Sequence, residues 1–156
     1  MAAFTGSPAS TKQRVDQVNG IPESFSLANL RGKTVTYVHS LGAGTGEVNL
    51  YKLPAGPIRL LTNLCSFTAS QFGALATLDL GYREYVDNVG DTQAEDGNAF
   101  LSAADVAAGA TTKTFLALPA AGFIDFNSAA GVVIFATIGT GNIENDDTIR
   151  MNLYWT

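Results

Sequence analysis

The chain has 156 residues, of which 46% are hydrophobic and 15% charged, with a net charge of −5 at pH 7. This length suits one domain with a real core, and a charged content below the roughly 25% of typical domains suggests that much of the surface is uncharged or covered by partners. The acidic balance and the nine scattered basic residues disfavour sequence-independent nucleic-acid binding. No apolar run approaches the roughly 20 residues that span a membrane.

Residues 1–30 differ from the rest of the chain. Residues 2–11 are small, polar and aperiodic, so they bury too little apolar surface to offset the entropy of ordering themselves. We interpret 1–30 as an extended N-terminal arm that becomes ordered on a partner or a neighbouring subunit. A tail without a role is the alternative. The first residues also lack the charged and apolar regions of a signal peptide, which predicts synthesis and folding in the cytoplasm.

Residues 31–156 are predicted to form one β-sandwich domain, because short stretches of alternating apolar residues are separated by turns. In the central stretch 74–82, Ala74, Ala76, Leu78, Leu80 and Tyr82 share one face. The segments expected as strands are 33–41, 47–53, 58–67, 74–82, 99–101, 112–118, 123–126, 131–138 and 148–155.

The connections between these strands are mostly glycine-rich or acidic. Gly42–Gly46 is expected to be a flexible loop, and 87–98 and 139–147 to be acidic loops. Ser102 and Asp105 fit a capping box, so one helical turn is expected over 102–108. With almost no other helix, the pattern indicates an all-β jelly-roll sandwich of about eight strands. An immunoglobulin-type sandwich is disfavoured, because the cysteine pair around a central Trp is missing.

The sequence shows no catalytic or metal-binding signature, so we expect neither enzymatic activity nor a cofactor. His39, the single histidine, lacks a nucleophile motif and is expected in the core or at a subunit interface. Cys65, the single cysteine, lies in an apolar run and is expected to be buried. One His and one Cys cannot build a zinc site, and the acidic loops lack the order of calcium ligands found in an EF-hand. The residues of a possible exposed recognition loop are Tyr85, Asp87, Asp91, Glu95 and Asp96.

Several segments between residues 33 and 156 resemble small structural proteins of tailed bacteriophages. The resemblance rests on Ala76–Tyr82, the Gly- and Asp-rich loop after it, Asp105–Gly109 before a Thr-rich strand, and Gly131–Thr137. Some members of this group are capsid decoration, or cement, proteins with a jelly-roll fold that sit as trimers on the outer shell. The resemblance does not extend to the arm.

This resemblance implies a non-enzymatic virion protein that binds the outer surface of a phage capsid as a homotrimer and stabilises it. The implied partners are the major capsid protein and further copies of this chain, without nucleic acid or membrane. The arm residues expected to contact the capsid or a neighbouring subunit are Phe4, Arg14, Val15, Val18, Ile21 and Phe25. The alternative is a carbohydrate- or receptor-binding jelly-roll module of a phage fibre or tail.

Overall fold

The computed structural model describes residues 30–40, 42–107, 111–114 and 122–156. Within these ranges the chain forms strands and turns and contains no helix. The strands are β1 (Arg31–Val38), β2 (Gly44–Lys52), β3 (Gly56–Leu60), β4 (Ser66–Ala69), β5 (Thr77–Tyr82), β6 (Tyr85–Val86), β7 (Thr92–Gln93), β8 (Asp96–Asp105), β9 (Thr111–Thr114), β10 (Ile124–Ser128), β11 (Val133–Ile143) and β12 (Thr148–Trp155).

The strand pairing is nested from the two ends of the domain toward its middle. Each strand pairs antiparallel with its counterpart counted from the other end: β1 with β12, β2 with β11, β3 with β10, β4 with β9, β5 with β8 and β6 with β7. The domain is therefore one long hairpin, and its turn, residues 87–91, lies between β6 and β7.

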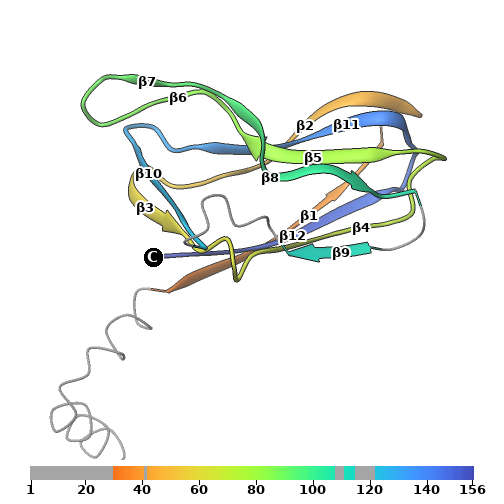
Figure 1. Ribbon diagram of the computed structural model, residues 1–156, viewed down its shortest axis with the longest axis horizontal. Helices are drawn as coiled ribbons and strands as arrows, with labels where there is room; N and C mark the ends of the chain where they lie inside the picture. The colour runs from red at the N-terminus through yellow and green to blue at the C-terminus, as the bar shows by residue number, and fades with distance from the viewer. Residues whose placement is uncertain (1–29, 41, 108–110, 115–121) are drawn as a thin grey trace, which may run out of the picture.

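This hairpin is rolled into two facing layers (Figure 1). The first sheet has β12 between β1 and β4, with β9 beside β4 and the β3–β10 pair beside the end of β12. The second sheet has the order β2-β11-β5-β8. Eight strands in two four-stranded layers, wound as nested pairs, form a jelly roll. The predicted all-β fold is confirmed, and the β3–β10 and β6–β7 pairs are additions to the eight.

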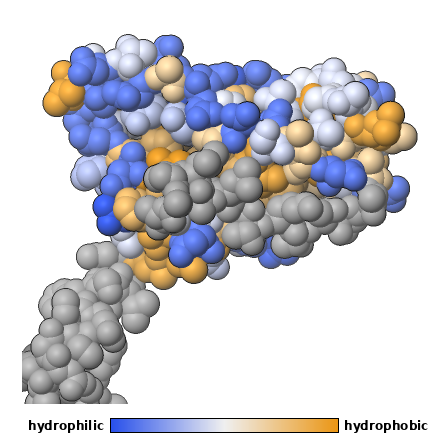
Figure 2. Space-filling model, in the orientation of Figure 1, coloured by the Kyte–Doolittle hydropathy of each residue, from blue (hydrophilic) through white to orange (hydrophobic). Residues whose placement is uncertain are grey.

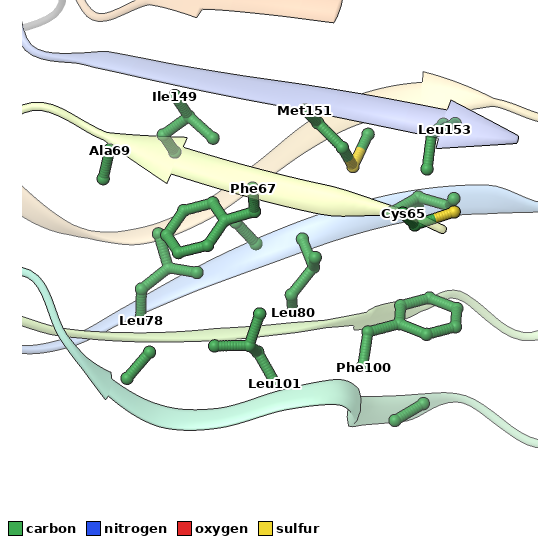
Figure 3. Close-up of a cluster of buried hydrophobic side chains, with 14 of the residues drawn as sticks. Cys65, Phe67, Ala69, Leu78, Leu80, Phe100, Leu101, Ile149, Met151 and Leu153 are labelled. Carbon is green, nitrogen blue, oxygen red and sulfur yellow. The ribbon is translucent and has the colours of Figure 1, made fainter. Parts of the chain in front are cut away.

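The core fills the space between the two sheets. Figure 3 shows Phe67 and Met151 of the first sheet pointing toward Leu78, Leu80 and the other core side chains of the second sheet. The burial of β12 alternates along its length, because successive side chains of a strand point to opposite faces. Its bounds agree with the segment expected from sequence.

Two predicted elements are wrong because tertiary pairing overrides local pattern. The apolar run 58–67 is two strands, β3 and β4, separated by a turn in which the amides of Leu64 and Cys65 donate to the carbonyl of Leu61. The two halves pair with different neighbours, β3 with β10 and β4 with β12 and β9.

The helical turn expected at Ser102 is strand β8 instead, since Ala104 and Asp105 pair with β5. The left-handed φ of 46° at Ala103 marks an irregularity in that strand, and its amide donates to the carboxylate of Asp79.

Other strand boundaries also differ from expectation, of which the following affect the loops. Strand β2 already begins at Gly44, inside the expected glycine loop, and β11 continues to Ile143, inside the second acidic loop, after a register shift. Strand β5 begins only at Thr77, and Ala74 is exposed rather than on the buried face. The first acidic loop holds the β6–β7 hairpin and the start of β8. The arm residues and part of the strand expected over 112–118 lie outside the described residues.

Candidate binding surfaces

The turn of the long hairpin is held by the carboxylate of Asp87. This carboxylate accepts hydrogen bonds from the amides of Val89 (3.0 Å) and Asp91 (2.9 Å) and from the side chain of Gln93 (3.0 Å). The hydrogen bond from the Asp91 amide is the main reason that the pKa of Asp87 lies below its ordinary value. Asp87, predicted as a recognition residue, has its acceptor capacity used inside the turn, where it acts as an Asx-type cap.

Glu95 belongs to an ion-pair group on the outer face of the second sheet. The guanidinium of Arg83 lies 2.8 Å from Glu47 and 3.1 Å from Glu95. It also stacks over the ring of Phe135, at 3.7 Å from the ring centroid, and a cation over an aromatic face is favourable. This arrangement covers Phe135, which is fully buried although it points outward. Since Arg83 and Phe135 are far apart in sequence, no local sequence pattern predicts this contact.

Tyr85 packs inward at the base of the hairpin. Its ring lies 6.1 Å from that of Tyr82 and 5.8 Å from that of Phe126, and the rings of Tyr82 and Phe126 are 5.1 Å apart, all edge-on. Burial raises the pKa of both tyrosines above the ordinary value. Tyr85 is therefore mainly a packing residue that anchors the hairpin.

Asp91 and Asp96 are exposed, and Asp96 accepts a hydrogen bond from the amide of Asn98 at 3.3 Å. The side chains of four of the five predicted loop residues thus make contacts within the domain, although Asp96 stays as exposed to solvent as Asp91. Within the described ranges, no three His, Cys, Asp or Glu side chains gather closely enough to hold a metal ion. No helix of those ranges is long and apolar enough to cross a membrane.

The hairpin tip, residues 86–91, carries exposed aliphatic side chains. They were not predicted from the sequence, where this loop was described only by its acidic residues. Val86 is 49% exposed and Val89 is 80% exposed. Figure 2 shows hydrophobic colour at the end of this hairpin, beside hydrophilic surface. The available signal was two valines within a turn otherwise made of Asp, Asn and Gly.

Across β1, β12 and β4, the outer face of the first sheet carries few charges, and the exposed ion pair of Arg59 and Asp125 lies on the β3–β10 part of that face. Thr34, Asn152 and Ser66 form one row across β1, β12 and β4, joined by hydrogen bonds of 2.8 and 3.1 Å between their side chains. The next row contains Thr36 and Arg150. Arg150 is exposed and forms no ion pair with any residue that the structure describes. The outer face of the second sheet, with Glu47 and Asp79, is acidic by contrast.

A hollow of about 480 Å³ opens between the edge strands β1 and β2. His39 lies in its wall and is buried, with Nε2 2.7 Å from the carbonyl of Gly42 and Nδ1 2.9 Å from the hydroxyl of Tyr37. A carbonyl only accepts, so Nε2 donates and Nδ1 accepts from Tyr37. Both ring nitrogens are therefore used in holding the loop after β1. This geometry gives His39 a structural role.

Comparison with known proteins identifies the fold. No protein-family model and no curated protein matches the sequence. A chain from the capsid of Ralstonia phage GP4 is similar in structure, with 14% identity, a TM-score of 0.60, and coverage of 82% of this chain and 84% of that chain. A chain from the Cyanophage Pam1 capsid asymmetric unit has 15% identity, a TM-score of 0.50, and coverage of 81% and 84%. At these identities the likeness shows a shared fold.

Proposed function

We propose that this chain is a structural virion protein that binds the outer surface of a phage capsid as a homotrimer and stabilises it. The observation that carries the proposal is the jelly roll that it shares, over more than four fifths of both chains, with chains from two phage capsids. The partners are the major capsid protein and two further copies of the chain. The role needs no catalysis.

The polar groups of the domain support a binding rather than a chemical role. The carboxylate of Asp87, the ring of His39 and the guanidinium of Arg83 are each occupied by partners within the domain. The outer face of β1, β12 and β4, which carries few charges, suits contact with another protein, because burying few charges costs little desolvation. Many copies on one shell make modest contacts effective through multivalency.

The N-terminal arm is proposed to supply part of the capsid or intersubunit contact. It precedes β1 and contains six residues whose side chains suit such a contact: Phe4, Arg14, Val15, Val18, Ile21 and Phe25. An arm that becomes ordered on binding can span a seam between capsid subunits, at the cost of its ordering entropy.

The test is decoration of particles that lack the protein. Full-length protein is added to such particles, and an electron cryomicroscopy map should show three copies clustered on the outer surface. Deletion of residues 1–20 should abolish this density while leaving the thermal unfolding transition in place. The matched control removes residues 1–3 and keeps all six arm residues, so it should decorate normally. Absence of full-length protein from the particles refutes the function, and normal decoration by the 1–20 deletion refutes only the role of the arm.

A further inference from the structure

The hairpin tip, residues 86–91, presents apolar surface that the domain itself does not use. Val89 is 80% exposed and Val86 is 49% exposed, whereas the large hydrophobic residues of the flanking strands β5 and β8 are buried or half-buried. Scattered exposed apolar residues are common on proteins, so exposure alone does not distinguish this site. The distinguishing feature is that two aliphatic side chains lie on a short turn that is rigidly held.

The tip is fixed from within and from the side. Asp87 ties the amides of Val89 and Asp91 to its carboxylate, and its own amide donates to the carbonyl of Asp91 at 2.9 Å. The end of β10 and the first residue after it support the other side. The amide of Asn88 donates to the carbonyl of Asn127 at 3.0 Å, and the amide of Ala129 donates to the carbonyl of Val86 at 3.2 Å.

This bracing has a consequence for binding. An element that already holds its bound shape loses little conformational entropy on association, so more of the contact energy appears as affinity. A turn with six or more internal and lateral hydrogen bonds is therefore suited to insertion into a partner. The buried Phe126 and the half-buried Tyr82 and Tyr85 anchor its base.

Acidic residues surround the two valines. Between residues 84 and 98 the sequence has five carboxylates and no Lys or Arg. Glu84, Asp91 and Asp96 are exposed and form no ion pair with any described residue. A partner that covers the valines must face these charges, and electrostatic complementarity then requires positive charge at the edge of its contact.

We propose that the hairpin tip docks into an apolar socket, bordered by Lys or Arg, on the outer surface of the capsid shell. Val89 and Val86 fill the socket, and Glu84 and Asp91 face the basic border. The proposal rests on the proposed function for the identity of the partner, and it names the part of the domain that makes the contact. It places this contact on the folded domain, separately from the arm.

The first experiment compares two double variants on particles that lack the protein. Val86→Ser with Val89→Ser should lower the apparent affinity about tenfold or more, because the apolar contact is lost. The control, Leu64→Ser with Leu75→Ser, alters two aliphatic residues that are 50% and 77% exposed elsewhere on the domain, and it should bind like the unaltered protein. Both variants should keep the unfolding temperature and the oligomeric mass of the unaltered protein.

The outcomes separate the two proposals. If the unaltered protein binds and both variants bind equally well, the docking of the tip is overturned and the proposed function stands. If the unaltered protein does not bind, both fall. If the tip variant instead changes the oligomeric mass, the tip is a contact between copies, and docking on the capsid is overturned.

A second measurement tests the charge of the partner. Binding of the unaltered protein should weaken as salt rises from 50 to 300 mM, since exposed charges are screened over about 8 Å at physiological ionic strength. Asp91→Lys should weaken binding at low salt and reduce this salt dependence. Binding that is insensitive both to salt and to Asp91→Lys would overturn the basic border.

Discussion

Gly81 lies in β5, at a point where the backbone of the neighbouring strand β8 comes unusually close. A Cβ atom added at residue 81 would lie 2.0 Å from the carbonyl oxygen of Asp96 and 2.4 Å from the carbonyl carbon of Gly97. Both atoms belong to the backbone of β8, at the register shift between Leu80 and Tyr82. This close approach fixes the position of the first residues of β8 relative to β5, and the hairpin tip extends from these two strands.

Gly81→Ala is predicted to destabilise the domain severely. The new contact is about 1 Å shorter than the 3.0 Å below which real Cβ contacts are not found, and a strand backbone cannot rotate away as a side chain can. Overpacking a core costs about 1–3 kcal/mol and occasionally more. Loss of glycine freedom in the unfolded chain returns only about 0.4–1 kcal/mol. We expect a net loss of about 2 kcal/mol or more, a large part of the 5–15 kcal/mol of a typical domain.

Urea unfolding followed by the fluorescence of Trp155, the single tryptophan and a buried residue, measures this loss. The matched control is Gly97→Ala, on the neighbouring strand. A Cβ at residue 97 would meet only the ring of Phe135, at an ordinary 3.6 Å, so the control should change the free energy of unfolding by less than about 1 kcal/mol. Equal urea midpoints for the two variants would refute the close approach of β8 to Gly81.

Two further predictions concern titrating groups. Burial raises the pKa of the Cys65 thiol to about 11, so a thiol reagent at pH 8 should react at the rate of unfolding, and rapid reaction of the folded protein would contradict the burial. The pKa of Asp87 is lowered in the folded protein, so its hold on the turn is complete above the ordinary carboxyl pKa of about 3.9 and is lost as the pH falls through the lower folded value. The amide chemical shifts of Val89 and Asp91 should therefore move below about pH 4, and this movement should be absent in Asp87→Asn.

The candidate site was only partly predictable from the sequence. The loop after β5 was identified, because Asp, Asn and Gly cluster there, whereas the contacts that its carboxylates make within the domain were not foreseen. Asp87 and Glu95 are used within the domain, and the exposed side chains at the tip include Val86 and Val89 as well as Asp91. The partners that occupy Asp87 depend on the turn geometry, and Glu95 meets Arg83 only when β8 lies beside β5.

By itself, the sequence determined most of the extended segments and the apolar face of those whose alternation is regular. The alternation in β12 is complete within eight residues, because the period of two in a strand is a local property. The tertiary structure alone decided which strands pair and in what register. Arg31 pairs with Trp155 across almost the whole domain, whereas the apolar run 58–67 divides into β3, which pairs mainly with β10, and β4, which pairs with β12 and β9. Strand pairing depends on which of several distant segments forms the most favourable contacts with a given strand edge. A local sequence pattern holds no information about those distant segments.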